Sequence, residues 1–112
     1  MKLNELEGVL SVDVHNAAKN NDCDVTGVYC SDLLSNVMGQ AKPGMLWLTM
    51  QAHPNIVAVA SLLGLAGVVL TGGVQPESDT VVKAEKEEVP LFSASVSSFE
   101  AAGRLYQKGL RG

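Results

Sequence analysis

The sequence predicts a three-layer α/β/α protein, in which a mostly parallel sheet of about five strands lies between two layers of helices. Segments with the period of strands alternate with segments with the period of helices along the chain. The runs 45–50 and 68–71 are almost wholly apolar, which is typical of central strands covered on both faces. A chain of 112 residues has the length of one domain, so we expect a single domain over residues 1–112.

The first predicted elements are a short helix and a short strand. Leu3, Leu6 and Leu10 recur at helical spacing and predict a helix over residues 2–10. The segment 12–14 then alternates between apolar and polar residues, which indicates a half-exposed strand.

A polar segment separates this strand from the next one. Residues 16–24 are rich in Asn, Asp and Lys and predict a surface loop. Residues 25–30 are mainly β-branched and aromatic and predict a second strand, in which Gly27 indicates a bulge or a close backbone approach. Because no helix separates these two strands, they could pair antiparallel and make the sheet mixed.

A helix is predicted after the second strand. Ser31 fits the N-cap of that helix, and Asp32 would lie in its first turn, where a carboxylate is favoured. The helix should end at 42–44, because the sequence Lys-Pro-Gly does not continue a helix. Its apolar stripe consists of Leu33, Leu34, Val37, Met38 and Ala41.

Residues 46–73 predict one parallel β-α-β unit. Its helix begins with Pro54 at the first helical position and ends near Gly64 and Gly67. Apolar residues cover almost the whole circumference of this helix, so we expect it to be sandwiched. These residues are Ile56, Val57, Val59, Ala60, Leu62 and Leu63.

Another helix and a last strand follow this unit. Pro76, Ser78 and Asp79 indicate the start of the helix, whose acidic residues 85–88 should be solvated. Residues 90–94 predict the last strand.

The final element is a helix that opens with a capping box. Ser97 and Glu100 have the spacing at which each side chain can cap the other residue's backbone. The face that this helix should share with the core consists of Phe99, Ala102, Tyr106 and Leu110.

Composition excludes several kinds of function. The net charge is -4 and the lysines are scattered singly, so we expect no nucleic-acid partner. The first ten residues lack the apolar run of a secretion signal, which predicts a cytoplasmic protein. As a helix, the longest apolar run, 56–70, would span about 22 Å, which is shorter than the ~30 Å hydrocarbon core, so we expect no membrane span.

Motifs for metal, redox and phosphoryl chemistry are also absent from the sequence. Cys23 and Cys30 lack the short spacing of zinc sites, and we expect neither a metal nor a cofactor. The sequence contains no G-x-x-x-x-G-K-[ST], no G-x-G-x-x-G, no G-x-S-x-G and no H-E-x-x-H. No standard route of hydrolysis or phosphoryl transfer is therefore indicated.

The strongest candidate site lies where the third strand gives way to its helix. Thr49, Gln51, His53 and Asn55 lie within seven residues of one another. Ligands bind at this end of the strands in open α/β sheets, and the first free N–H groups of the helix would favour a carboxylate or phosphate. The structural alternative is that these side chains cap the helix and satisfy the turn.

Three further features could contribute to such a site. Asp32 would face the same crevice if its strand neighbours that of Thr49, although capping would also explain it. The segment 71–73, Thr-Gly-Gly, could approach a phosphate or simply form a turn. His53 could act as a base, but the sequence places no nucleophile or acid beside it.

The chain resembles the DRTGG domain family, whose relatives include the N-terminal, non-kinase domain of HPr kinase/phosphorylase. The resemblance rests on the segments 24–28, 31–38 and 49–60. It implies a three-layer fold like that N-terminal domain, a regulatory role and homodimers, in domains that occur alone or attached to CBS pairs or phosphate acetyltransferase. It also adds Thr26 and Gly27 to the candidate ligand-binding residues. It does not imply kinase activity, because the sequence has no phosphate loop.

We therefore expect a non-catalytic regulatory or sensor domain that binds a small polar or anionic ligand, such as a nucleotide or a phosphorylated metabolite. The candidate ligand-binding residues are Asp32, Thr49, Gln51, His53, Asn55, Thr26 and Gly27. The alternative is a protein-interaction adaptor or dimerisation module that associates with a larger metabolic enzyme. An enzyme that uses His53 as a base is a third hypothesis.

Overall fold

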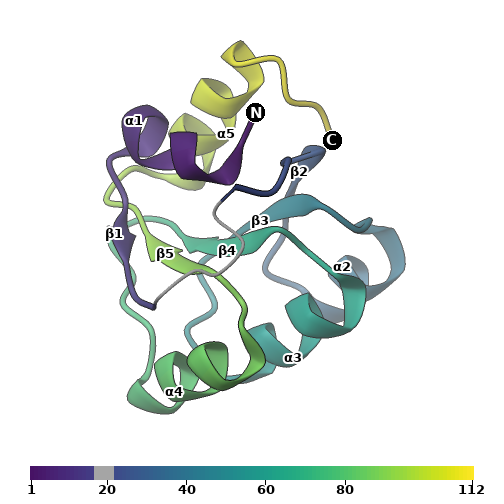
Figure 1. Cartoon of the computed structure of the whole chain (residues 1–112), viewed down its shortest axis with the longest axis vertical. Coiled ribbons are helices and arrows are strands. Elements are labelled where there is room, and N and C mark those ends of the chain that lie inside the picture. Colours follow the sequence, from purple (N-terminus) through teal and green to yellow (C-terminus); the bar gives the residue numbers. More distant parts are fainter. Residues whose placement is uncertain (17–21) are drawn as a thin grey trace.

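The computed structural model describes residues 1–16 and 22–112, and it contains a five-stranded sheet between two layers of helices (Figure 1). This confirms the predicted three-layer class. Most of the loop predicted over 16–24 lies outside the described residues. In chain order the elements are η1 (Leu3–Glu5), α1 (Leu6–Leu10), β1 (Asp13–Val14), β2 (Gly27–Cys30), α2 (Leu34–Gln40), β3 (Met45–Thr49), α3 (Asn55–Leu63), β4 (Gly67–Leu70), α4 (Ser78–Glu87), β5 (Leu91–Ser93) and α5 (Ser98–Gln107).

The strands lie in the order β1-β5-β4-β3-β2. From β2 to β5 each neighbouring pair is parallel, whereas β1 pairs antiparallel with β5. The mixed sheet and the parallel β3-α3-β4 unit are thus confirmed. The suggested antiparallel pairing of β1 with β2 is wrong, because these strands lie at opposite edges of the sheet.

Long-range contacts hold β1 and the residues after it against β5. The His15 backbone N–H donates to the Leu91 carbonyl over 2.9 Å, and the Asn16 side chain donates to the Val89 carbonyl over 2.6 Å. The Asn16 side-chain oxygen also accepts the Leu91 N–H over 3.1 Å. His15 Nε2 lies 2.7 Å from Ser93 Oγ, which is 78 positions away in the sequence. A local pattern gives no sign of such partners, which explains why the pairing was not predicted.

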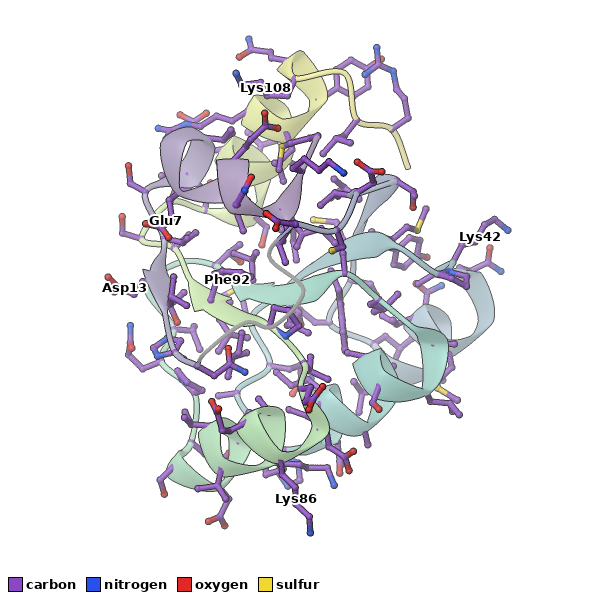
Figure 2. All side chains as sticks on the ribbon, viewed as in Figure 1. Glu7, Asp13, Lys42, Lys86, Phe92 and Lys108 are labelled. Carbon is purple, nitrogen blue, oxygen red and sulfur yellow. The ribbon has the colours of Figure 1, made fainter. Side chains whose placement is uncertain are left out.

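Each face of the sheet has its own apolar core. The alternation of β3 divides its side chains between the two cores. Met45 and Trp47 pack with residues of α2, α3 and α4, whereas Leu46 and Leu48 pack with residues of η1, α1 and α5. All five residues of β3 are buried, as expected of a central strand. Figure 2 shows Phe92 inside the molecule, and it shows charged side chains at the periphery, among them Glu7, Asp13, Lys42, Lys86 and Lys108.

The helix α3 lies between α2 and α4, in agreement with the predicted sandwiched position (Figure 1). Its apolar coverage is narrower than predicted, because Leu62 is 71% exposed. The helix begins at Asn55, with Pro54 as its N-cap, and ends at Gly64 in the left-handed conformation. Neither α3 nor any other helix in the described parts of the chain is long and apolar enough to cross a membrane.

The helix α2 begins later than predicted. Ser31 is not its N-cap, because Ser31 Oγ accepts the backbone N–H of Leu33 over 3.2 Å and closes a turn before the helix starts at Leu34. The predicted end before the Lys-Pro-Gly segment is confirmed. Of the predicted apolar stripe, Val37 is fully buried, while Leu33 and Met38 are exposed.

The helix α5 has the predicted cap but a different buried face. Ser97 Oγ accepts the backbone N–H of Glu100 over 3.2 Å, which confirms the Ser97 half of the predicted capping box. The buried helical residues are Ala101 and Leu105. The prediction is wrong for Phe99 and Tyr106, which are 89% and 59% exposed, whereas Leu110 is buried as predicted and Ala102 packs against the same core. The small side chain of Ala101 lets the helix approach the sheet closely, and this favours the observed rotation.

The C-terminal tail covers part of the outer edge of β2. The Val28 N–H donates to the Arg111 carbonyl over 2.9 Å. The Arg111 guanidinium lies 3.8 Å from the ring centre of Tyr106 and donates to the carbonyls of Tyr106 and Leu110. A Cβ at Gly27 would lie 2.6 Å from the Arg111 carbonyl oxygen, which confirms the predicted close approach of backbone at this glycine.

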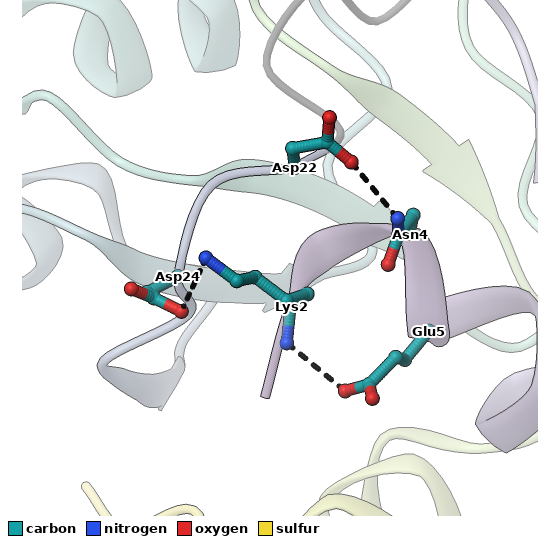
Figure 3. A network of polar contacts seen from close by, with 5 residues as sticks. All are labelled: Lys2, Asn4, Glu5, Asp22 and Asp24. Carbon is teal, nitrogen blue, oxygen red and sulfur yellow. Dashed lines mark hydrogen bonds and ion pairs between the residues drawn. The ribbon is translucent and has the colours of Figure 1, made fainter.

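The N-terminal residues are joined to the start of the β2 segment by a polar network (Figure 3). Lys2 Nζ lies 3.1 Å from Asp24 Oδ1, and the Asn4 side chain donates to Asp22 Oδ1 over 2.9 Å. The Lys2 backbone N–H donates to the Glu5 carboxylate over 3.0 Å. The predicted N-terminal helix is therefore present as η1 followed by α1, and its three leucines are buried.

Candidate functional site

The side chain of Asp32 joins the carboxyl ends of β2 and β3. Its Oδ1 accepts the Thr49 hydroxyl over 2.8 Å and the Met50 backbone N–H over 2.7 Å. Thr49 is buried, whereas Asp32 is exposed. Asp32 was expected to face the same crevice as Thr49 only if their strands were neighbours. β2 and β3 are neighbours in the sheet, so this condition is met.

Gln51 belongs to the same group of contacts. Its side-chain amide donates to the Asp32 carbonyl over 2.9 Å, and its backbone N–H donates to Thr49 Oγ1 over 3.2 Å. The Thr49 hydroxyl thus donates one hydrogen bond and accepts another. The strand ends at Thr49, so strand alternation does not continue to Gln51. We call Asp32, Thr49 and Gln51 the strand-end cluster.

His53 and Asn55 lie at the start of α3. His53 Nδ1 accepts the backbone N–H of Asn55 over 3.0 Å, so the imidazole caps the helix. In a neutral ring that accepts at Nδ1, the proton is on Nε2. The second ring nitrogen of His53 is therefore an N–H donor, and the ring does not present a free basic lone pair to solvent.

The first N–H groups of α3 are already hydrogen-bonded. Besides the bond from Asn55 to the His53 ring, Ile56 N donates to the His53 carbonyl over 3.1 Å, and Val57 N donates to the Pro54 carbonyl over 3.0 Å. The prediction of free N–H groups at this helix start is wrong, because the turn itself supplies their acceptors. An anion at this edge would have to bind side-chain donors.

Four of the predicted site residues reach solvent at this edge: Asp32, Gln51, His53 and Asn55. The Asn55 side-chain amide has no hydrogen bond with the rest of the described chain. Together these side chains offer one carboxylate, two amides and one imidazole N–H.

The turn after β4 is also satisfied internally. Thr71 Oγ1 lies 2.6 Å from Ser98 Oγ, and the N–H groups of Gly72 and Gly73 donate to carbonyls of the segment after β5. This arrangement favours the turn interpretation of residues 71–73 over a phosphate loop. A Cβ at Gly72 would lie 3.6 Å from Met50 Cε, so the Met50 side chain lies against this turn.

Sequence reasoning missed the support that α4 gives to the site. Thr80 is buried in α4, and its hydroxyl donates to the Ala52 carbonyl over 2.6 Å. The Glu77 N–H donates to the same carbonyl over 3.2 Å. The only sequence signal for this contact is a residue with a hydroxyl group among the apolar positions of the helix. A threonine in such a position can have many other roles, so the sequence does not predict this contact.

Thr26 and Gly27 lie apart from the strand-end cluster. They are at the amino end of β2, whereas the cluster is at the carboxyl end. Thr26 donates its hydroxyl to the Pro43 carbonyl over 3.2 Å and its N–H to the Gly44 carbonyl over 2.9 Å. The structure therefore divides the predicted ligand-binding residues between two ends of the sheet.

The two cysteines are free, and neither is activated. Burial raises the pKa of the Cys30 thiol, and the negative charge of Asp32 raises it further. Burial and the charge of Asp24 raise the pKa of Cys23. Nucleophilic cysteines have a lowered pKa, so these two thiols lack that property. No three metal-binding side chains gather within residues 1–16 and 22–112.

Three hollows of the described surface lie away from the strand-end cluster. Their volumes are about 540, 210 and 130 Å³. The largest is lined in part by Thr26 and lies at the amino ends of β2 and β3. Six predicted site residues line none of these three hollows: Asp32, Thr49, Gln51, His53, Asn55 and Gly27.

These features define an α/β domain in which polar side chains join the carboxyl ends of two parallel strands. Residues 5–108 match the model of the DRTGG domain family, and the chain belongs to this family. The resemblance seen in the sequence is thus confirmed.

A solved structure with the same fold comes from Clostridium perfringens. It contains the CBS and DRTGG domains of the regulatory region of a pyrophosphatase, complexed with the activator diadenosine tetraphosphate. The TM-score is 0.80 at 18% sequence identity, and the match covers 95% of this chain and 46% of that chain. The comparison with the curated proteins gave no match.

Proposed function

We propose that this protein is a non-catalytic regulatory domain that binds a small polar or anionic ligand at the carboxyl ends of β2 and β3. The observation that carries the proposal is the strand-end cluster, in which Asp32 joins the turns after both strands. Open α/β sheets bind ligands at this edge. Membership of the DRTGG family and the likeness to part of a pyrophosphatase regulatory region support a regulatory role.

The exposed groups at this edge suit a nucleotide or a phosphorylated metabolite. The imidazole N–H of His53 and the amide of Asn55 are donors for phosphate oxygens. The exposed Asp32 carboxylate is an acceptor for hydroxyl groups such as those of a ribose. Met50, which is 51% exposed, offers an apolar contact for a base.

The proposed absence of catalysis is supported by the geometry around His53. Its Nδ1 already accepts a backbone N–H, and none of its contacts in the described chain is with a nucleophilic side chain. General base catalysis requires a lone pair within reach of the proton that is removed.

A thermal-unfolding assay with ATP, AMP and diadenosine tetraphosphate tests the proposal. We expect at least one of these compounds to stabilise the wild-type protein, by about 2.7 kcal/mol at one hundred times its Kd. Gln51→Ala and His53→Ala should reduce this stabilisation. Gln107→Ala, an exposed glutamine on α5, is the matched control and should keep it. If none of the three compounds, and no other phosphorylated metabolite in a wider screen, stabilises the wild type, the proposal fails.

A second candidate function is a dimerisation or protein-interaction module that acts on a partner enzyme. It is favoured by large apolar side chains that remain exposed near the carboxyl ends of the strands. These are Leu33 (63% exposed), Met50 and Phe99 (89% exposed), and we call them the apolar rim. Contiguous exposed apolar patches are a common feature of interaction sites.

Measurement of the molar mass in solution tests this second function. If the apolar rim forms a homodimer, the wild type should have twice the mass of the chain, and Phe99→Ser should shift it toward the monomer. Val82→Ser, which changes another exposed apolar residue on α4, should leave the mass unchanged. A wild type that stays monomeric at high concentration contradicts the homodimer.

A further inference from the structure

We infer that the hollow at the amino ends of β2 and β3 is a second binding site, which takes a small aromatic anion. Its volume of about 540 Å³ falls in the range of small-molecule sites, ~300–1,000 Å³. It lies at the opposite end of the strands from the strand-end cluster, so it does not depend on the proposed function.

The hollow lies beside the start of β2, on the face of the sheet that α2 covers. Gly27 is paired with Met45 in the sheet register, and strand alternation places both on the face covered by α2. Gly27 itself is buried and does not line the hollow, because the Arg111 carbonyl oxygen and Met45 Cε already occupy the space beside it, 2.6 and 3.3 Å from where a Cβ would stand. The helix α2 ends at Gln40, so it does not extend over this region.

One wall of the hollow is apolar and fixed in place. Tyr29 contributes a half-buried ring, whose hydroxyl donates to Asn36 Oδ1 over 2.6 Å and so fixes the ring. Met45 contributes a buried thioether, and Pro43 contributes its ring. A planar aromatic group fits such a wall, because aromatic rings stack on other rings and on thioethers.

The rim of the hollow offers donors for an anion. Lys42 and Gln40 line it, and neither side chain has a hydrogen bond or ion pair with another described residue. The whole chain has a net charge of -4, but among the described residues that line this hollow Lys42 carries the one charged side chain, and Gly112, the last residue of the sequence, lines it as well. The charged end of Lys42 stands at the molecular surface, where it can meet an anionic group at the mouth (Figure 2).

The turn that carries Lys42 is held rigidly. The Lys42 N–H donates to Met45 Sδ over 3.3 Å, and the Gly44 N–H donates to the Gly64 carbonyl over 2.9 Å. The Thr26 hydroxyl donates to a carbonyl of the same turn. A preformed turn reduces the entropy lost on binding. The ligand is therefore an aromatic ring with one anionic group. The ring would contact the apolar wall, and the anionic group would contact the donors at the rim.

An NMR titration of the full chain with phenyl phosphate tests this inference, with inorganic phosphate and phenol as parallel probes. We expect phenyl phosphate to shift the amide signals of Thr26, Tyr29 and Lys42, and to bind more tightly than either parallel probe. Lys42→Met should weaken binding about tenfold, because it removes a charged hydrogen-bond donor. Lys86→Met, on α4, is the matched control and should bind as the wild type does.

Several results would overturn the inference. One is the absence of shifts at these amides at millimolar phenyl phosphate. Others are unchanged affinity in Lys42→Met, or equal affinity for inorganic phosphate. Shifts of the Gln51 and His53 signals on addition of a nucleotide would instead report on the site of the proposed function. The two proposals are therefore tested by different signals, and either can be wrong without the other.

Discussion

At the scale of single residues, Asp32 is the side chain on which the ends of two strands depend. It is exposed, yet its Oδ1 is the acceptor for a buried hydroxyl and a backbone N–H. A surface carboxylate usually contributes little to stability, but one that satisfies a buried donor contributes more.

We predict that Asp32→Ala lowers the free energy of unfolding by about 1–2 kcal/mol, because the Thr49 hydroxyl loses its acceptor. Urea unfolding followed by circular dichroism measures this loss. Asp13→Ala, at another exposed aspartate, should change the free energy by less than about 0.5 kcal/mol. Equal unfolding midpoints for the two variants would contradict the role given to Asp32.

Cys30 gives a prediction about pH. Burial, and then the charge of Asp32, raise the pKa of its thiol, so the thiolate fraction at a given pH is lower than in the unfolded chain. The rate of alkylation of Cys30 should therefore reach its midpoint at a higher pH in the native protein than in urea. Asp32→Asn removes the charge and should move that midpoint to lower pH. Peptide mass spectrometry separates Cys30 from Cys23. A native midpoint below that in urea would contradict this assignment.

The candidate residues were predictable at this scale, but their partners were not. The clustering of Thr49, Gln51, His53 and Asn55 is visible in the sequence. The contact of Thr49 with Asp32 depends on β2 and β3 being neighbours in the sheet. The sequence does not determine the order of the strands, so this contact was expected only if these two strands were adjacent. The capping of α3 by the His53 ring depends on a rotamer, which residue spacing does not determine.

At the scale of elements, the start of α5 and the end of α2 were predicted correctly, whereas the start of α2 and the buried helix faces were predicted less well. The cap at Ser97 and the end of α2 follow from local chemistry and are present. The prediction of the buried face of α5 was wrong at Phe99 and Tyr106, because these aromatic residues had been expected to pack against the core. Large aromatic side chains are usually favoured for burial. Between α5 and the sheet, however, the smaller side chain of Ala101 is buried instead.

The close approach of the tail to β2 leads to a prediction about glycines. Gly27→Ala should lower the free energy of unfolding by about 1–3 kcal/mol, because the new Cβ would lie 2.6 Å from the Arg111 carbonyl oxygen. Gly103→Ala is the matched control, since a Cβ in that part of α5 meets no atom within 4 Å. It should stabilise the protein by about 0.5–1 kcal/mol through helix propensity. Chemical denaturation of both variants checks the opposite signs, and a shift of the same sign would contradict the packing at Gly27.

At the scale of the whole molecule, one sheet carries two cores. Trp47 belongs to the core under α2, α3 and α4, and Leu105 belongs to the core under α1 and α5. Because β3 contributes side chains to both, neither core can form without the same strand.

We therefore predict that the two cores unfold in one transition. Leu105→Ala should cost about 2–5 kcal/mol and should lower the midpoint seen by Trp47 fluorescence as much as the midpoint seen by circular dichroism. Leu62→Ala changes a leucine that is 71% exposed and should have little effect. Midpoints that differ between the two probes would show that the cores unfold separately.

The class of the fold was predictable because periodicity and apolar runs are local properties of the sequence. The alternation of strands and helices indicates an α/β sheet with helices on both faces, and the apolar runs identify its central strands. The place of β1 was not predictable, since it depends on contacts such as that of His15 with Ser93. The sheet is mixed, as the sequence suggested, but the antiparallel pair is β1 with β5 and not β1 with β2.

The position of β1 also has a consequence for biosynthesis. The strands β2, β3 and β4 each meet the next strand of the chain through a short crossover, whereas β1 must wait for a partner 78 positions later. Closing so long a loop is slow relative to local pairing. We expect β1, the first strand of this domain to be synthesised, to be the last to join the sheet. Until then the β5 edge of the nascent domain is open to pairing with other chains.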